Sequence, residues 1–389
     1  MIIKEYLDSL EPSTPETFTE EQLKESFEAF IELDVHLENI ETSLYGLESI
    51  RNQLKTQLKE RGLSPITAQF LHLAVEGFTQ PIGVHSTDLV PSVESFNNAP
   101  NHSTTKITIE SIEQTVDKIW NTVKEIVAAI WKKINEFIKR YFTQFGVLKG
   151  KVDALIKSVS VITVEKQLTV RVPRILRYNN EIPSFSGISK EINALEETTK
   201  VLKTRYIPEA RMYIQSVVDD LNTLSEEDVN KKNKENFNVE KVLHIEEGHS
   251  PLLIGDKYFI IDQGSGIPSL VDLFNKESLD ADKLLKRDVM VRRAEIESLL
   301  KGVKDLTDIS ISTKNDIDQF QRFYFQNQGA IDRLTDKIKE AVIFMAKSRA
   351  LRKNILKPVI QLLQHNYQVC NGAFMVAEYC ISQKQNNDQ

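Results

Sequence analysis

Residues 112–145 read IEQTVDKIWNTVKEIVAAIWKKINEFIKRYFTQF, and this stretch decides the fold. Apolar side chains recur along it every three or four residues, which is the period of one face of an α-helix. They are Ile112, Val116, Ile119, Val123, Ile126, Ile130, Ile134, Phe137, Tyr141 and Phe145. No Pro or Gly interrupts the pattern before Gly146, and a glycine there is typical of a helix C-terminus. The sequence therefore predicts one amphipathic helix of about 50 Å.

A second apolar stripe adjoins the first and widens the hydrophobic face of this helix. It consists of Trp120, Val127, Trp131, Ile138 and Phe142, and lysines and an arginine flank it. Three interpretations are open: the central helix of an all-α core, a face that lies on a membrane, or a surface for a partner helix. A helix that spans a membrane is disfavoured because charged residues recur at every turn.

The first 94 residues differ from the rest of the chain in charge. They hold 17 acidic and 6 basic side chains, a net charge of −11, whereas residues 95–389 have a net charge of +4. Helical spacing of apolar residues predicts helices over 20–62 and 67–78. Residues 80–105 contain three prolines among Ser, Thr, Asn and His and have no helical period, which indicates a linker. We therefore expect an acidic helical segment over 1–94 and a separate body over 95–389.

The body is predicted to be mostly helical with a small β element. Residues 158–177 are rich in β-branched side chains and indicate one or two strands, and 251–262 predicts a β-hairpin around Gly255-Asp256. Residues 189–224 are expected to form a helix that Pro208 kinks or breaks. From 279 to the C-terminus the pattern predicts helix almost throughout. The predicted fold class is mainly α, with long amphipathic helices and a small β-hairpin or sheet in the C-terminal body.

No motif in the sequence predicts an enzyme, a cofactor or a metal site. The segment HIEEGH, 244–249, has two histidines, but their spacing does not suit zinc ligands on a helix. A hydrolase that uses His244, Glu246 and His249 is the remote alternative. The two cysteines, Cys370 and Cys380, form no disulfide framework or zinc-knuckle pattern. The opening MIIKEYLDSLEP carries early acidic residues without an apolar core, so no secretory signal is expected.

A candidate proteolytic processing site lies in the linker. In PSVESF, Ser92 stands two residues before Glu94, and the small Ser95 follows it. Glu76 followed by Gly77 has the same form and is a second candidate. The tripeptide alone is common in this chain, but Glu94 lies where the acidic segment meets the body, in a composition that suits an exposed, extended substrate. The alternative is an ordinary surface glutamate in a loop.

The run AVEGF…IGV…LVPSVESFNN followed by IESI…VDKIWNTVKEIVAAIWKKINEFIKRYF resembles the internal head (prohead core) proteins of large tailed bacteriophages. The resemblance covers roughly residues 65–145. It implies an N-terminal propeptide that the prohead protease removes by cutting after Glu94, with Ser92 and Glu94 as recognition positions and Ser95 as the new N-terminus. It also implies that the chain meets capsid and prohead core proteins, starting in the host cytoplasm, and that the body stays in the virion interior with packaged DNA.

Removal of an acidic propeptide would leave a body of net charge +4, and positive charge favours retention beside DNA through counterion release. Ejection of the body into the host with the DNA is a further expectation. Two other functions remain open. A membrane-active protein would use the 112–145 helix as its effector and would bind liposomes. A cytosolic helical adaptor would remain a full-length chain with a specific protein partner.

Overall fold

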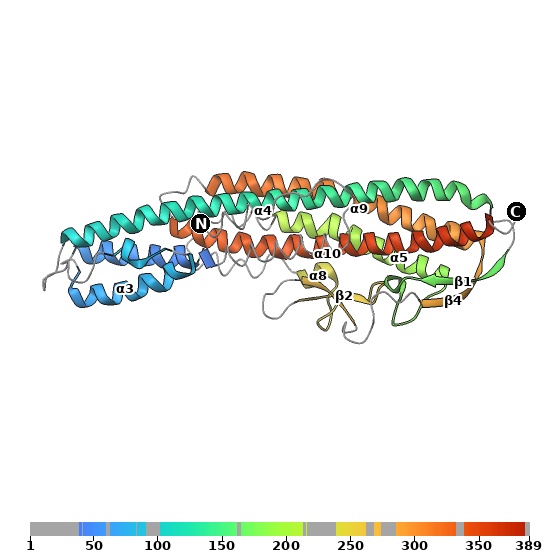
Figure 1. Cartoon of the computed structure of the whole chain (residues 1–389), viewed down its shortest axis with the longest axis horizontal. Helices are drawn as coiled ribbons and strands as arrows, with labels where there is room; N and C mark the ends of the chain where they lie inside the picture. Colours follow the sequence, from blue (N-terminus) through green and yellow to red (C-terminus); the bar gives the residue numbers. More distant parts are fainter. Residues whose placement is uncertain are drawn as a thin grey trace. The chain divides into compact units, whose positions relative to one another are not determined.

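The computed structural model describes residues 39–40, 42–59, 63–82, 84–90, 102–161, 165–212, 215, 239–261, 268–273, 285–331 and 338–385. The chain forms two compact units, and Figure 1 shows the helices and strands that make them up. The first consists of Met1–Lys139 and Ile331–Lys347, and the second of Arg140–Ala330 and Ser348–Gln389. The described residues are predominantly helical and carry two small antiparallel sheets, so the predicted mainly α class is confirmed.

The first unit contains a helix over 42–59, helix α3 (Pro65–Thr79) and the beginning of α4 (His102–Ser158). Ser64 caps α3, because its hydroxyl accepts a hydrogen bond from the Thr67 backbone N–H at 3.2 Å, and Pro65 occupies the first turn. Two short 3₁₀ turns follow, Gln80–Ile82 and Ser86–Asp88. The helical segments expected before residue 80 are therefore present where the structure describes the chain.

Helix α4 is longer than the predicted helix, beginning at His102 and ending at Ser158. The expectation that Gly146 ends it is wrong. The apolar period continues past Gly146 to the buried Leu148 and Val152, while Gly146 and Gly150 lie on the exposed face. Each glycine costs a helix about 1 kcal/mol, whereas burial of each of those two side chains contributes about 1.5–3 kcal/mol, so burial decides. The predicted strands over 158–177 accordingly shrink to β1 (Lys166–Val172), which lies between 3₁₀ turns at Val159–Val161 and Arg174–Leu176.

The second unit is built around the C-terminal part of α10 (Ile338–Gln385), which packs with α5 (Phe185–Val201) and α9 (Arg293–Ile331). Asn366 on α10 is buried and donates hydrogen bonds to Thr199 Oγ1 on α5 at 2.9 Å and to Ser310 Oγ on α9 at 3.1 Å. These bonds fix the register of three helices, because shifting one helix along another would leave buried polar groups unpaired.

Pro208 does not end the helix that begins with α5. A π-helical turn spans Leu202–Tyr206, and the chain continues as an α-helix over 207–212. A proline has no N–H to donate and crowds the preceding turn, and a π turn widens the helix at that point. The predicted interruption at Pro208 therefore takes the form of a local widening. A short helix, α8 (Val239–Leu243), follows.

One of the two sheets joins strands that are far apart in sequence, and the other joins strands that are close together. Strand β1 pairs antiparallel with β4 (Leu285–Val291), and β2 (Lys257–Ile261) pairs antiparallel with β3 (Pro268–Asp272). The predicted turn at Gly255-Asp256 is present: Leu253 bridges to Lys257 across it, and the Ser250 N–H donates to the Phe259 carbonyl oxygen at 2.8 Å. Strand β2 forms its ladder with β3, so only one arm of the predicted hairpin is a strand. The prediction for 251–262 is therefore right about the turn and wrong about the second strand, and the expectation of helix almost throughout after 279 missed β4.

Candidate processing site and the interface around it

The predicted cleavage site, Ser92, Glu94 and Ser95, falls in 91–101, outside the described residues. The described residues on both sides of this segment are packed into the first unit. Leu89 and Val90 are buried before it, and Thr104 and Thr105 are buried at the start of α4. The bond after Glu94 therefore joins two anchored parts of one compact unit.

The two sides of the predicted cut share one hydrophobic core. The helix over 42–59, α3 and α4 lie side by side in the first unit (Figure 1). Among the described residues, the buried apolar side chains before the cut are Ile40, Leu44, Leu47, Ile50, Leu54, Leu63, Ala68, Leu71, Val75, Leu89 and Val90. Those in the first turns of α4 after the cut are Ile109, Ile112, Val116 and Ile119. Burial of a large aliphatic side chain contributes about 1.5–3 kcal/mol. Packing, as well as the peptide chain, therefore holds the two sides together.

Polar contacts also cross the predicted cut. The backbone N–H of Leu63 donates to Thr105 Oγ1 at 2.9 Å, and both groups are buried. Lys55 Nζ lies 2.6 Å from Glu113 Oε1, and Arg51 Nη1 lies 3.7 Å from the same oxygen. Because Lys55 and Glu113 are partly exposed, this ion pair contributes at most about 1 kcal/mol. The buried hydrogen bond is the more specific of the two contacts.

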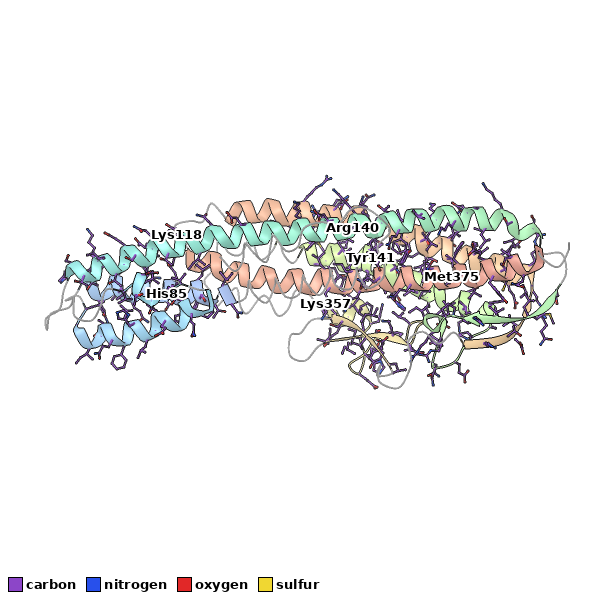
Figure 2. The ribbon with its side chains drawn as sticks, viewed as in Figure 1. His85, Lys118, Arg140, Tyr141, Lys357 and Met375 are labelled. Atoms are coloured by element: carbon purple, nitrogen blue, oxygen red, sulfur yellow. The ribbon has the colours of Figure 1, made fainter. Side chains whose placement is uncertain are left out.

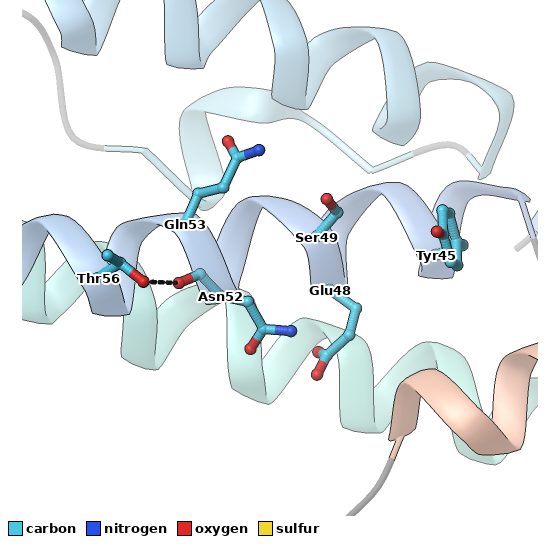
Figure 3. A pocket seen from close by; sticks show the side chains of 6 residues that line it. All are labelled: Tyr45, Glu48, Ser49, Asn52, Gln53 and Thr56. Atoms are coloured by element: carbon cyan, nitrogen blue, oxygen red, sulfur yellow. Dashed lines mark hydrogen bonds between the residues drawn. The ribbon is translucent and has the colours of Figure 1, made fainter. Parts of the chain in front are cut away.

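Glu48 lies within this interface and is almost fully buried. One of its carboxylate oxygens contacts Arg51 Nη2, and the other has no hydrogen-bond partner. Burial raises the pKa of the Glu48 carboxyl, and the neighbouring Arg51 and Lys55 oppose that rise. Glu48 also lines a groove of about 300 Å³ along the 42–59 helix, together with Tyr45, Ser49, Asn52, Gln53 and Thr56 (Figure 3). Each of the six lining side chains carries a polar group.

The second predicted cleavage position, between Glu76 and Gly77, lies inside α3. The Glu76 carbonyl accepts a hydrogen bond from the backbone N–H of Gln80 at the helix C-cap. A protease that binds an extended chain could cut here only after the last turn of α3 had unwound. The local structure therefore favours the linker position over Glu76.

The predicted membrane or partner face of α4 is described in part. The side chains of Trp120, Val127 and Trp131 lie outside the described residues, and Ile138 and Phe142 are buried. Next to Phe142, the Tyr141 ring packs edge-on against Tyr367 of α10 with centroids 5.9 Å apart, near the point where α4 enters the second unit (Figure 2). A membrane or partner could reach Ile138 and Phe142 only by displacing their present neighbours.

The histidine-rich segment 244–249 forms a tight turn. His244 and Glu247 have positive φ, Glu246 bridges to His249, and the His249 ring packs edge-on against Tyr258 with centroids 5.8 Å apart. Within the described ranges, no three His, Cys, Asp or Glu residues are grouped so that they could hold a metal ion. Nor does any helical stretch in those ranges combine the length and apolarity needed to cross a bilayer.

Long helices with buried apolar faces make this a mainly helical protein. The sequence matches the family of phiKZ-like phage internal head proteins over residues 16–364, and the chain belongs to that family. The resemblance seen over residues 65–145 thus extends over most of the chain. Membership implies a location inside the phage head. No curated protein and no solved structure matches the chain.

Proposed function

We propose that residues 1–94 are a propeptide, which the prohead protease removes by cutting after Glu94, and that residues 95–389 remain inside the head as a non-enzymatic structural protein. The observation that carries this proposal is the charge division at that bond, −11 before it and +4 after it. A cut at this position changes the net charge of the chain from −7 to +4 in one step.

The charge change gives the processing a physical role. Packed DNA is a dense polyanion, and a protein with excess acidic charge is repelled by it. An uncut chain of net charge −7 would enter a DNA-free prohead, where no such repulsion acts. A mature body of +4 would then be retained beside the incoming DNA by counterion release, and it could leave with the DNA on ejection.

The first-unit interface adds a requirement to this account. Because both sides of the cut lie in one compact unit with buried apolar side chains, and Leu63, Arg51 and Lys55 contact Thr105 and Glu113 across it, cleavage of one peptide bond does not by itself separate the propeptide from α4. Release of residues 1–94 therefore requires local unfolding of the first unit or further cuts within the released segment. Other Glu positions of small–x–Glu form before residue 94, among them Glu11, Glu28, Glu48 and Glu76, are candidates for such cuts.

Infection with phage that carry single substitutions tests the proposed site. Glu94→Gln removes the carboxylate while keeping the side-chain volume, so it should leave a full-length chain in the heads. Glu76→Gln is the matched control and should leave cleavage after Glu94 unchanged. A mature N-terminus at Ser95 in the Glu94→Gln variant would refute the assignment of Glu94 as a recognition residue.

A further inference from the structure

Helix α3 carries an apolar stripe that the described residues of the first unit leave exposed. Ile66, Phe70 and Leu73 are 69%, 68% and 66% exposed. Their spacing of four and three residues places them on one face of the helix. The opposite face holds Ala68, Leu71 and Val75, which are buried in the first unit. The packing of α3 therefore does not depend on the exposed stripe.

The composition of α3 disfavours a lipid surface as the occupant. Its sequence, PITAQFLHLAVEGFT, contains no Lys or Arg, and Glu76 is its one acidic residue. A helix that lies on an anionic membrane presents a basic rim beside its apolar face. The stripe is apolar without that rim, so a second apolar helix face suits it better.

The stripe is complementary to itself when two copies of α3 run antiparallel. Its N-terminal half carries the large Ile66 and Phe70, and its C-terminal half carries Ala74 and Gly77. No atom lies within 4 Å of the position that a Cβ on Gly77 would occupy. An antiparallel pair centred between Phe70 and Leu73 sets each Ile66 over the open Gly77 of the other copy.

Charge favours the same arrangement. In an antiparallel pair the two Glu76 carboxylates lie at opposite ends, about 13 Å apart along the axis, beyond a Debye length at physiological salt. A parallel pair would bring them side by side. The antiparallel pair is also isologous, so it closes as a dimer with the same patch on both copies.

We propose that the exposed face of α3 is a self-association surface, on which α3 of a second copy of this chain docks antiparallel. Three large side chains that are two-thirds exposed offer roughly 400 Å² per copy. The total of roughly 800 Å² is below that of a stable dimer, so the contact is weak and forms at high local concentration. Helix α3 lies before Glu94 in the sequence, but this proposal concerns the uncut chain and does not depend on cleavage.

Sedimentation equilibrium of the full-length chain over a wide concentration range tests the contact. The wild-type chain should dimerise with a dissociation constant of about 10 µM to 1 mM. Phe70→Glu should raise that constant at least about ten-fold, because it buries a charge at the centre of the contact. Met212→Glu is the matched control, since Met212 is 64% exposed in the second unit. That control should dimerise like the wild type.

Disulfide trapping tests the orientation. In the double variant Ile66→Cys/Gly77→Cys, the antiparallel pair predicts intermolecular bonds between position 66 of one copy and position 77 of the other. The native Cys370 and Cys380 are buried and do not compete. Bonds between two positions 66 would contradict the antiparallel arrangement.

Three results would overturn the proposal. The first is a wild-type chain that stays monomeric up to about 1 mM. The second is a dimer that Phe70→Glu leaves intact. The third is a chain that stays monomeric but binds phosphatidylcholine vesicles, or a different head protein, in a way that Phe70→Glu abolishes. Hydrogen exchange over 63–79 shows whether Phe70→Glu keeps the fold of α3, so that loss of dimerisation is not mistaken for unfolding.

Discussion

The backbone N–H of Leu63 donates a hydrogen bond to Thr105 Oγ1 at 2.9 Å, and the two residues lie on opposite sides of the predicted cleavage site. The bond is buried, so neither group has water as a substitute partner. It ties the segment before α3 to the first turns of α4. Residues 1–94 and the start of α4 thus differ in charge but are joined by a buried contact within one unit.

Thr105→Val should weaken this connection. The substitution keeps the shape of the side chain and removes the acceptor, so the buried Leu63 N–H loses its partner at a cost of about 1–3 kcal/mol. Faster hydrogen exchange in peptides covering 63–79 measures the loss. Thr115→Val, at a half-buried position of the same helix, is the control and should change stability by less than about 0.5 kcal/mol. Equal exchange in both variants would show that the hydrogen bond contributes little.

The shared core predicts that the two pieces associate without a covalent link. Residues 1–94 and 95–389 coexpressed as separate chains should copurify through a tag on the shorter one. Ile112→Glu places a charge in the buried contact and should abolish copurification. Ile107→Glu changes a residue of α4 that is 51% exposed and should preserve it. Loss of copurification in both variants, or in neither, would contradict the interface.

Gly255 should tolerate substitution worse than Gly248, although both have positive φ, +84° and +91°. A Cβ on Gly255 would lie 2.8 Å from His365 Cε1 and 3.0 Å from the Ile175 carbonyl oxygen, whereas one on Gly248 would meet nothing within 4 Å. Gly248→Ala should cost about 1 kcal/mol from backbone strain alone. Gly255→Ala should cost about 3 kcal/mol, because a packed ring and the backbone would both have to move. The midpoints of urea unfolding compare them.

His365 should make the second unit less stable in acid. Burial lowers the pKa of His365 to about 3, with Lys257 adding to the effect, and Nε2 lies 2.6 Å from the Ile254 carbonyl oxygen. In the unfolded chain the pKa returns to about 6.5, so the unfolded state binds the proton first as the pH falls. The stability from this group is complete above pH 6.5 and declines toward pH 3.

Between pH 7.5 and 4.5 this loss amounts to roughly 2–3 kcal/mol, measured by urea unfolding. His365→Gln removes the titration and should reduce the pH dependence by about that amount. His85→Gln, which changes an exposed histidine of the first unit, should retain it. An unchanged pH dependence in His365→Gln would mean that other groups cause the acid destabilisation.

Local pattern predicted the helices well and the tertiary pairing poorly. The three- and four-residue period identified α4 at residue level, and Ile112, Val116 and Phe145 are all buried. The same pattern continues beyond Gly146 to Leu148 and Val152, whose burial outweighs the cost of a glycine within the helix. Strand β4 was missed because its partner β1 lies more than a hundred residues earlier, and a nonlocal partner leaves no local signal.

At the candidate site, too, the sequence predicts local features but not tertiary contacts. The composition of the linker and the charge of its two sides identified Glu94 as the place where the chain changes character. The association of the helices before residue 90 with the start of α4 could not be predicted. An apolar pattern shows that a helix has a buried face, but it does not identify the helix against which that face packs. The exposed stripe of α3 was also missed, since Ile66, Phe70 and Leu73 have the same spacing as core residues.

Intact mass and N-terminal peptide mapping of the protein from purified phage heads test the central claim most directly. A chain that begins at Ser95 and lacks the acidic segment is the predicted result, and it would establish both the cut and the release of the propeptide. A chain that begins at Met1 would contradict the account, because the body would then keep its acidic segment in the mature head.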